Sequence, residues 1–419
     1  MKVLVVGGGG REHAIVDALT RSPQVDKIYC APGNAGIALQ AECVPVSDHD
    51  IEGLLGLAVE KNIDLTVVGP EIPLSLGIVA RFRGAGLKIF GPSAAAACVE
   101  SSKNFAKMVM TRHGIPTAAY RTFTCFDYDE AVEYVRGGAF PVVLKYDGLA
   151  AGKGVVIPET FEEAERELKE MLLEGKFGEG KVVIEEYLTG PEFSLMCFVS
   201  GRKVWPMPIA QDHKRAFDGD KGPNTGGMGA YTQLPFITEE DKTYALEHIM
   251  KPMAAALVEE DCPFTGVLYG GLMKTPDGIK VIEFNCRFGD PETEVVLPLL
   301  DSDIADVFLA IAEGRDPQPL VWSDDVTMGV VLASKGYPGA YEKGCPIKGL
   351  ENVRAKVYHM GTKSVNGGLV TAGGRVMMTV VRDKDIHSAQ RRVYGEIAKI
   401  ECPGVFYRSD IAHWALKQS

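Results

Sequence analysis

The sequence predicts a multidomain protein of mixed α/β and α+β class whose first domain is a doubly wound, Rossmann-like sheet. Its 419 residues exceed one ordinary core, so roughly two to four domains are expected. In the first hundred residues, short apolar strands are each followed by a turn rich in glycine or proline, which is the pattern of βα units in a parallel sheet. Beyond residue 114 strand patterns dominate, which favours α+β domains there.

Composition and charge limit the kinds of partner. The formal net charge is −12, which argues against a nucleic-acid surface but permits local basic pockets for phosphates. The nine cysteines form no Cys-x-x-Cys pair, which favours reduced thiols in a cytoplasmic protein over a disulfide framework or a zinc site. The N-terminus lacks a signal-peptide pattern, and no apolar run approaches a membrane span. We therefore expect a cytoplasmic protein without nucleic-acid or membrane partners.

The chain opens with an apolar strand, four glycines at 7–10 and a helical pattern. A dinucleotide-binding fingerprint does not fit, because Glu12 or His13 stands where its third glycine belongs. We prefer a turn whose backbone N–H groups, together with the start of the helix, bind a single phosphate. A purely structural turn is the alternative.

Three further strands, at 27–30, 64–68 and 88–90, continue this domain. The carboxyl ends of parallel strands share one edge of a sheet, where ligands bind in open α/β folds. Asn34 and Glu71 follow two of these strands and are candidates to bind a sugar hydroxyl or an amine. The alternative is that each only caps a turn, which is the commoner role of Asn and Glu in loops.

The middle of the chain contains a candidate triphosphate site. One basic helix is predicted at 100–113, with Lys103 near its start. A strand then ends in Lys145, and the loop 146–154 that follows contains three glycines and a lysine. Backbone N–H groups and ammonium groups in such a loop suit a lid over nucleotide phosphates. A Walker A loop is excluded, because Gly154 stands where Ser or Thr would bind Mg²⁺.

A helix is predicted at 161–173, and a strand at 181–188 then runs into a polar turn. The strand's backbone at 185–188 suits the edge of an adenine ring, and Glu192 in the turn suits ribose hydroxyls. By itself, this segment indicates only a buried strand followed by a turn.

The stretch 281–293 alternates in polarity, so we predict a strand with one apolar face and one polar face. Glu283 and Asn285 on the polar face are hard oxygen ligands that suit Mg²⁺ shared with substrate phosphates. Arg287 suits an anion bound through two hydrogen bonds. The turn at 275–278 predicts a hairpin with the preceding strand. The alternative is an edge strand whose polar face lies in water.

The polar, glycine-rich segment at 211–228 is expected to be a functional loop, since apolar strands on both sides disfavour disorder. His213 in this loop could accept a proton, although a plain hydrogen-bonding role is preferred. From residue 326 onward, three strands and a helix at 386–400 predict a small α+β domain that closes one side of the site.

The order of Lys145, the glycine loop, Glu-Glu-Tyr-Leu at 185–188 and Glu283-Phe-Asn285 resembles that of the ATP-grasp ligases. Within them the chain resembles, over essentially its whole length, the phosphoribosylamine–glycine ligase family. Small departures at Arg81, Tyr146, Gly270, Cys286 and Met360 remove no group assigned to chemistry. The motifs that carry the resemblance are Gly-Gly-Arg-Glu-His at 9–13, Pro-Gly-Asn-Ala-Gly at 32–36, Val-Gly-Pro-Glu at 68–71, Phe-Gly-Pro-Ser at 90–93, Asp-Gly-Leu-Ala-Ala-Gly-Lys-Gly at 147–154, Gln-Asp-His-Lys-Arg at 211–215, Gly-Pro-Asn-Thr-Gly-Gly-Met-Gly-Ala at 222–230, Gly-Val-Leu-Tyr at 266–269 and the run from Glu283 to Glu292.

The resemblance implies three domains: an N-terminal phosphoribosylamine-binding domain at 1–102, an ATP-grasp domain at 103–325 with a mobile lid lobe at about 120–193, and a C-terminal α+β domain at 326–419. It implies ATP-dependent ligation of glycine to 5-phosphoribosylamine through a glycyl phosphate, giving glycinamide ribonucleotide, ADP and phosphate in purine (IMP) biosynthesis. Mg²⁺ or Mn²⁺ is the implied cofactor, and a monomer or weak homodimer is expected. Another ATP-grasp carboxylate–amine ligase, a bicarbonate-using carboxylase and a non-catalytic nucleotide sensor remain as alternatives.

The resemblance also implies roles for individual residues. The residues expected to bind ATP are Lys103, Lys145, Gly152, Lys153, Gly154, Glu185, Glu186, Tyr187, Leu188 and Glu192. Those expected to bind glycine or phosphoribosylamine are Gly9, Gly10, Arg11, Asn34, Glu71, Asp212, Lys214, Thr225, Gly226, Gly227, Met228 and Arg287. The expected metal ligands are Glu283 and Asn285, and the expected catalytic residues are Lys145, Asp212 and Arg287.

Overall fold

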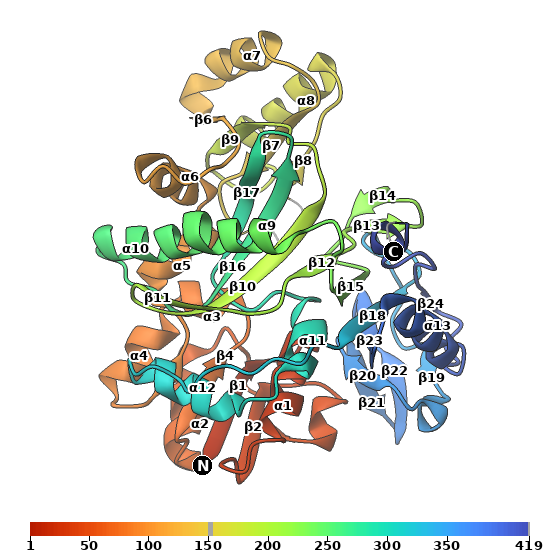
Figure 1. Cartoon of the computed structure of the whole chain (residues 1–419). Helices are drawn as coiled ribbons and strands as arrows, with labels where there is room; N and C mark the ends of the chain where they lie inside the picture. The colour runs from red at the N-terminus through yellow and green to blue at the C-terminus, as the bar shows by residue number, and fades with distance from the viewer. Residues whose placement is uncertain (150–153, 418–419) are drawn as a thin grey trace.

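In the computed structural model, which describes residues 1–149 and 154–417, the chain folds into an N-terminal domain, a central domain with a projecting lobe, and a C-terminal domain (Figure 1). The predicted fold class, a doubly wound first domain followed by a two-lobed domain and a smaller α+β domain, is confirmed. In Figure 1 the N-terminal domain lies at the bottom, the lobe at the top and the C-terminal domain at the right.

The N-terminal domain is a five-stranded parallel sheet with the strand order β3-β2-β1-β4-β5. Residues 3–6 of the central strand β1 are fully buried, which explains why this strand reads as a continuous apolar run. The strands of the domain are β1 (Lys2–Gly7), β2 (Lys27–Pro32), β3 (Glu42–Cys43), β4 (Leu65–Val68) and β5 (Ile89–Phe90), and its helices are α1 (Gly10–Leu19), η1 (Ile37–Leu39), α2 (Ile51–Lys61), α3 (Glu71–Ser75) and α4 (Ile78–Gly84).

The single helix predicted at 100–113 is wrong, because the chain breaks between α5 (Ala94–Ser101) and α6 (Lys103–Arg112). Ser102 adopts an extended conformation, and its side chain accepts a hydrogen bond from the backbone N–H of Phe105 at 3.1 Å. A serine in this position caps the start of a new helix. The break places Lys103 in the first turn of α6.

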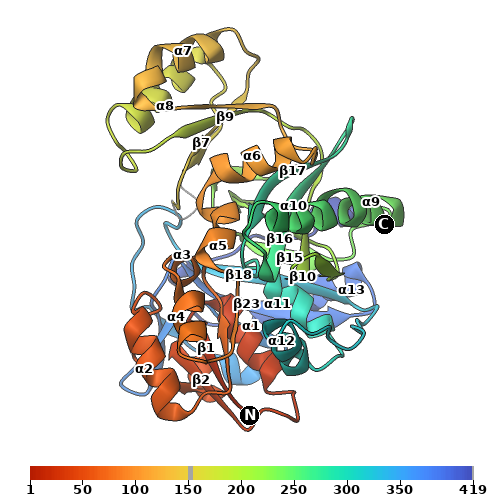
Figure 2. The same cartoon turned by 90° about the vertical axis from the view of Figure 1, so that its left-hand side faces the viewer.

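The lobe contains a four-stranded antiparallel sheet with the order β6-β9-β7-β8 and two covering helices. It has a small hydrophobic core of its own, and Figure 2 shows it standing clear of the N-terminal domain. Its elements are β6 (Tyr120–Phe123), η2 (Cys125–Asp127), α7 (Tyr128–Arg136), β7 (Val142–Tyr146), β8 (Val155–Val156), α8 (Phe161–Leu172) and β9 (Val182–Glu186).

The central domain is organised around a long antiparallel sheet. The predicted hairpin is present as β16 and β17, and β10 pairs with β16 along its whole length. The strands are β10 (Glu192–Ser200), β11 (Lys203–Pro206), β12 (Ala210–Asp212), β13 (Arg215–Phe217), β14 (Lys221–Asn224), β15 (Gly229–Thr232), β16 (Thr265–Thr275) and β17 (Gly278–Asn285). The helices are α9 (Glu239–Ala245), η3 (Leu246–Met250), α10 (Lys251–Glu259), α11 (Thr293–Val296), η4 (Leu297–Leu299) and α12 (Ile304–Ala312).

The C-terminal domain continues this sheet. The hydrogen bonds between β15 and β18 join the two domains, so the strand order runs β17-β16-β10-β12-β15-β18-β23-β20 without a break. The elements of the domain are β18 (Val326–Ser334), β19 (Pro346–Ile347), η5 (Leu350–Asn352), β20 (Lys356–His359), β21 (Thr362–Val365), β22 (Gly368–Thr371), β23 (Arg375–Asp383), α13 (Ile386–Ile397), β24 (Val405–Phe406) and α14 (His413–Leu416).

Two expectations about the central domain need correction. The segment 211–228 is not a plain loop, because β12, β13 and β14 lie within it and β13 pairs with β14 as a hairpin. The alternation along 281–293 is interrupted by a β-bulge, where the partners shift between Gly271 and Leu272. Val281 before the bulge and Phe284 after it therefore both pack into the core, although they differ in parity.

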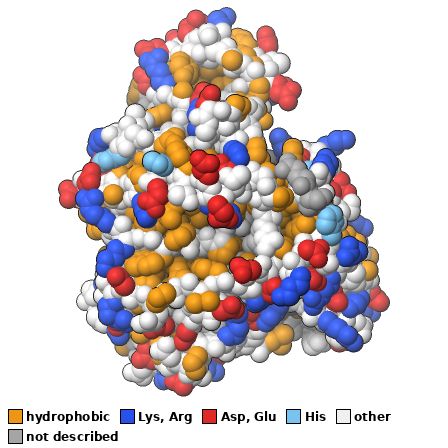
Figure 3. All heavy atoms as spheres, in the orientation of Figure 1, with side chains coloured by type: hydrophobic (Ala, Val, Ile, Leu, Met, Phe, Trp, Pro, Cys, Tyr) orange, Lys and Arg blue, Asp and Glu red, His pale blue; other side chains and the backbone are white. Residues whose placement is uncertain are grey.

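Among the described residues, none of the helices has the length and hydropathy needed to cross a membrane. On the face seen in Figure 3, acidic and basic side chains are interspersed.

Candidate active site

A cavity of about 470 Å³ lies where all three domains and the lobe meet. Arg11 and Glu71 come from the N-terminal domain, Lys145 from the lobe, and Tyr337 and Arg375 from the C-terminal domain. The central domain contributes the largest part of the lining. The cavity is therefore complete only when the domains are assembled.

One side of the cavity is basic. Lys103 at the start of α6 donates a hydrogen bond to the carbonyl of Gly148 at 3.0 Å. Lys145 at the end of β7 lies 3.0 Å from one carboxylate oxygen of Glu185, and Lys107 on α6 lies 2.9 Å from the other. Burial lowers the pKa of Lys107 to about 8, although the Glu185 carboxylate opposes this shift. Glu185 thus orients two buried lysines toward the cavity.

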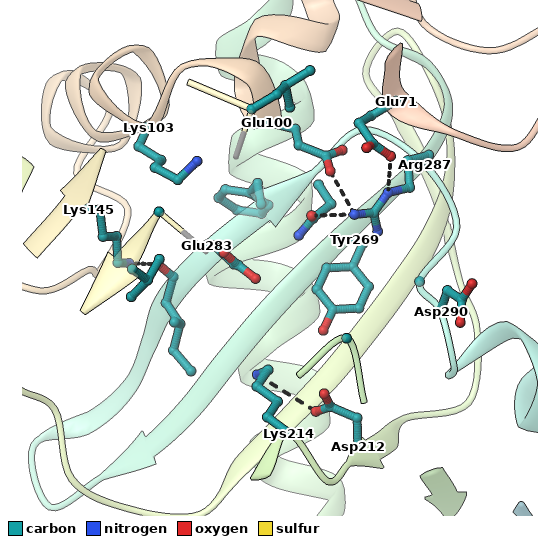
Figure 4. A pocket seen from close by; sticks show the side chains of 18 of the residues that line it. Glu71, Glu100, Lys103, Lys145, Asp212, Lys214, Tyr269, Glu283, Arg287 and Asp290 are labelled. Atoms are coloured by element: carbon teal, nitrogen blue, oxygen red, sulfur yellow. Dashed lines mark hydrogen bonds and ion pairs between the residues drawn. The ribbon is translucent and has the colours of Figure 1, made fainter. Parts of the chain in front are cut away.

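The polar end of β17 forms the floor of the cavity. Figure 4 shows the carboxylate of Glu283 pointing into the cavity between Lys145 and Tyr269. Burial opposes ionisation of Glu283, but Lys214, Lys145 and Lys103 outweigh it and lower the pKa of this carboxyl group. The side-chain oxygen of Asn285 accepts one hydrogen bond from Arg287 at 2.9 Å, which leaves its second lone pair for a ligand. An ionised carboxylate and an amide oxygen side by side are a donor set that fits Mg²⁺.

The guanidinium of Arg287 is already paired with two carboxyl groups. It donates to Glu100 at 2.7 Å, and its Nε lies 3.5 Å from Glu71, as the dashed lines in Figure 4 show. Burial disfavours its charge, but Glu100 and Glu71 more than compensate and raise the pKa of Arg287. Burial raises the pKa of Glu100, although Arg287 opposes this. Two carboxyl groups therefore hold Arg287 in one orientation.

The opposite side of the cavity is acidic. Asp212 at the end of β12 is buried, and Lys214 lies 3.7 Å from it and 2.7 Å from Glu192. Burial raises the pKa of Asp212, with Glu292 and Glu192 adding to the shift and Lys214 opposing it. Glu292 accepts hydrogen bonds at 2.9 Å from Ser194 and Tyr269. This side suits a small cationic group such as an ammonium.

The segment that follows β14 forms one rim of the cavity. The N–H of Gly226 donates to the hydroxyl of Tyr337 at 2.9 Å, and Arg375 donates to the carbonyl of Gly226 at 2.6 Å. Arg375 also forms an ion pair with Asp290 at 2.8 Å. The C-terminal domain therefore fixes this rim directly.

Several expected site residues have other roles in the structure. The side-chain amide of Asn34 donates to the carbonyls of Gly8 and His359 and accepts from the N–H groups of Gly36 and Ile37, so its alternative role as a turn cap is the observed one. Met228 is fully buried in the core.

At the glycine turn, the N–H of Gly9 donates to the carboxylate of Glu12 at 2.6 Å. That carboxylate occupies part of the proposed phosphate site. A Cβ atom on Gly10 would lie 2.4 Å from Glu294, so this position is tightly enclosed.

Glu186, Tyr187, Leu188, Glu192 and Gly227 do not line the cavity. Glu186 pairs with Lys280 at 3.0 Å, and both Glu186 and Tyr187 are exposed at the surface. Of the glycine loop, Gly148 and Gly154 lie beside the cavity, while Gly152 and Lys153 are outside the described residues.

His213 is not available as a proton acceptor in the cavity. Its Nε2 accepts a hydrogen bond from the N–H of Ala412 at 3.0 Å, and burial lowers its pKa. Together with Asp220 and His413 it forms a group with metal-ligand spacing. Arg408 already binds the Asp220 carboxylate at 2.9 Å, which disfavours a cation there.

Sequence reasoning missed several cavity residues: Glu100, Lys107, Tyr269, Asp290, Glu292, Tyr337 and Arg375. Glu292 and Asp290 lie within the motif 283–292 and could have been found there. Glu100 and Lys107 lie within the helical pattern at 100–113, where charged residues at positions on the buried face indicate a candidate site. Tyr337 and Arg375 reach the cavity only through the tertiary contact of the C-terminal domain, for which no local pattern exists.

Family models of the three domains of one enzyme match most of the chain. The models of phosphoribosylglycinamide synthetase match the N domain at residues 1–100, the ATP-grasp (A) domain at residues 101–293 and the C domain at residues 327–414.

Full-length relatives agree with the family models. A phosphoribosylamine–glycine ligase of Halalkalibacterium halodurans is 51% identical over 422 residues, covering 100% of this chain and 98% of the relative. The solved structure of the phosphoribosylamine–glycine ligase of Thermotoga maritima has a TM-score of 0.86 and 33% identity, covering 98% of this chain and 100% of that chain. A biotin carboxylase domain of Hydrogenobacter thermophilus, at 18% identity and a TM-score of 0.75 over 97% of this chain and 91% of that one, shares the fold.

Proposed function

The chain belongs to the phosphoribosylglycinamide synthetase family, and from this membership we propose how its cavity performs the family's reaction. The enzyme is a ligase that joins glycine to 5-phosphoribosylamine at the expense of ATP in purine biosynthesis. The observation that carries the proposal is the convergence of basic lysines, the Glu283–Asn285 pair and an acidic side in one cavity. We also propose that the domain boundaries lie at 102/103 and 325/326 and that the lobe at about 120–193 acts as a mobile lid.

ATP occupies the basic side of the cavity. Lys103 and Lys145 neutralise the triphosphate, and Gly154 brings the loop backbone close to it. Because Glu185 holds Lys145 in place, this lysine needs little reorganisation when a negative charge arrives. We assign adenine to the backbone at 185–188, between lobe and central domain.

Glu283 and Asn285 would hold Mg²⁺ or Mn²⁺, since they are hard oxygen donors and the carboxylate is ionised. When bound, the metal neutralises phosphate charge and orients the triphosphate for in-line transfer. Lys214 and Lys145 keep Glu283 ionised whether or not a metal is present.

Glycine binds on the acidic side. Asp212 receives its ammonium group, and the rim at Thr225 and Gly226 allows only a small substrate to approach. The glycine carboxylate attacks the γ-phosphorus of ATP, ADP leaves, and a glycyl phosphate forms. Catalysis at this stage is positioning and charge neutralisation, for which no protein nucleophile is needed.

Phosphoribosylamine enters from the N-terminal domain. Arg287, oriented by Glu100 and Glu71, and the neighbouring Arg11 suit its phosphate and ribose. Its amine attacks the carbonyl carbon of the glycyl phosphate, and phosphate leaves as the amide bond forms. A closed lobe protects the acyl phosphate from water during this step.

The test is ADP release by the purified protein with ATP, Mg²⁺ and glycine, with and without phosphoribosylamine made in the assay from ribose 5-phosphate and ammonia. We expect release that requires both co-substrates, with glycinamide ribonucleotide identified by mass spectrometry. Release that depends on bicarbonate instead of glycine would indicate a carboxylase, and binding of ATP without turnover would indicate a sensor. Gel filtration with light scattering tests our proposal of a monomer or weak homodimer.

We propose the cytoplasm as the site of action, because all nine cysteines are free thiols in the structure. Cell fractionation with an antibody to the native protein tests this assignment.

A further inference from the structure

Two cysteines far apart in sequence meet in the C-terminal domain. Cys402 donates a hydrogen bond from its thiol to the sulfur of Cys345 at 3.7 Å. Both side chains are partly exposed to solvent. A disulfide has a sulfur–sulfur distance of about 2.05 Å, so the two sulfurs need to approach by only about 1.7 Å.

The backbone holds the two cysteines at this distance. Lys348 and Glu401 exchange two hydrogen bonds of 3.0 Å each, which fixes the two segments side by side. The N–H of Cys345 donates to Thr371 at 3.1 Å. A Cβ atom on Gly404 would lie 2.7 Å from the Cys345 sulfur, so only a glycine leaves room for that side chain.

The two segments contact different parts of the central domain. The loop 335–345 carries Tyr337, whose hydroxyl binds the N–H of Gly226 on the cavity rim. The segment after Cys402 carries Arg408, which donates to the carbonyl of Arg215 at 3.0 Å. A bond between the two cysteines would therefore tie the loop that supports the cavity rim to the segment that supports the start of β13.

We propose that Cys345 and Cys402 form a reversible disulfide by exchange with small-molecule disulfides, and that this bond clamps the loop 335–345 against the C-terminal segment. The Cys345 thiol loses its proton to solvent and attacks one sulfur of the small disulfide, which forms a mixed disulfide and releases one thiolate. The Cys402 thiol then loses its proton and attacks the Cys345 sulfur, which releases the second thiolate. Two protein thiols are oxidised, and one small disulfide is reduced to two thiols.

The environment of Cys402 agrees with this order of attack. Burial, together with the hydrogen bond to Cys345, raises the pKa of Cys402. The hydrogen bond from Cys402 to the Cys345 sulfur keeps the proton on Cys402, so we assign Cys345 as the sulfur that reacts first.

The experiment exposes the full-length protein to excess oxidised glutathione and counts free thiols by maleimide labelling under denaturing conditions. We expect the count to fall from nine by at least two, with a single Cys345–Cys402 peptide pair in the digest and full reversal by dithiothreitol. The thermal midpoint of the oxidised protein should rise by a few °C, on the order expected for closing a long loop. Amide hydrogen exchange in 335–345 should slow several-fold.

Cys345→Ser and Cys402→Ser should each abolish the linked peptide and the rise in thermal midpoint. The matched control is Cys125→Ser, at an exposed cysteine in the lobe, which should keep both. Nine labelled thiols after oxidation, or a link between other cysteines, would overturn the proposal. So would a linked protein whose thermal midpoint and exchange at 335–345 are unchanged.

Discussion

Replacing Glu185 with glutamine should destabilise the enzyme in a pH-dependent way. The carboxylate is 3% exposed, and each of its oxygens pairs with a different lysine, at 3.0 Å to Lys145 and 2.9 Å to Lys107. Glu185→Gln keeps the shape of the side chain but leaves the two ammonium groups without the carboxylate that they share. Breaking a buried ion pair by removing one partner costs about 3–5 kcal/mol, and we expect the lower end at pH 7 because Lys107 can lose its proton.

The sign of the pH dependence follows from Lys107. Its pKa in the folded wild-type protein is about 8, so it is charged at pH 7. In the variant, burial and repulsion from Lys145 are no longer opposed by Glu185, so the pKa of Lys107 falls further below its ordinary value. The unfolded chain keeps the proton up to about pH 10.4, so raising the pH favours the folded variant. Between pH 7 and 8 the wild type itself gains about 0.4 kcal/mol, because its Lys107 is half deprotonated at pH 8. Over the same interval the variant should therefore gain up to about 1 kcal/mol relative to the wild type.

The assay is urea denaturation followed by circular dichroism at pH 7.0, 7.5 and 8.0, with ATP affinity measured in parallel. Glu186→Gln is the matched control, because the Glu186 carboxylate is 43% exposed and a surface pair contributes only about 0–1 kcal/mol. If Glu185→Gln and Glu186→Gln lose equal stability, or if the deficit of Glu185→Gln grows with pH, the account of this buried pair is incorrect.

Three further predictions concern the site and its surroundings. Asp212→Asn should lower kcat/KM for glycine by about 10²-fold, with the ATP affinity measured by calorimetry unchanged. Asp277 is exposed, so the control Asp277→Asn should have no effect on either quantity. Equal losses in both variants would remove Asp212 from the glycine site. Chelation by EDTA should abolish turnover, and added Mg²⁺ should restore it. Glu283→Gln should raise the Mg²⁺ concentration for half-activation about tenfold. An unchanged Mg²⁺ requirement in the variant would contradict the role of Glu283 as a metal ligand. Burial lowers the pKa of His13 to about 3 and that of His359 to about 4. Below about pH 6.5 the unfolded chain therefore takes up protons before the folded state does. Each histidine should cost the folded state up to about 1.4 kcal/mol of stability per pH unit between pH 6.5 and 4. Urea denaturation at pH 7.0 and 5.0 should show a smaller acid loss in His359→Gln, and an identical loss would refute the assignment.

Local patterns predicted much of the fold because they report local physics. The parallel strands of the first domain are buried on both faces and were visible as apolar runs. The hairpin of β16 and β17 was visible in its turn. The split at Ser102 was missed because one helical periodicity spans both helices, and only the capping serine marks the break.

The candidate site was predictable where its residues lie in one motif, as Glu283, Asn285 and Arg287 do. The residues that hold these side chains in place could not be predicted from the sequence. Glu100 binds Arg287 across 187 positions, and Glu185 reaches Lys107 only because α6 packs beside the lobe. The bulge at Gly271 and Leu272 depends on the pairing of two strands, so the alternation of one strand could not reveal it.

The unbroken sheet across β15 and β18 determines how the polypeptide tolerates truncation. A chain cut before Val326 would lose the partner of β15 and present unpaired backbone N–H and C=O groups along that edge. Such an edge recruits strands from other molecules, so a shortened protein should aggregate instead of remaining a dispersed two-domain fragment. The lobe has its own small core and sheet, so its strand pairing does not depend on the junction between β15 and β18.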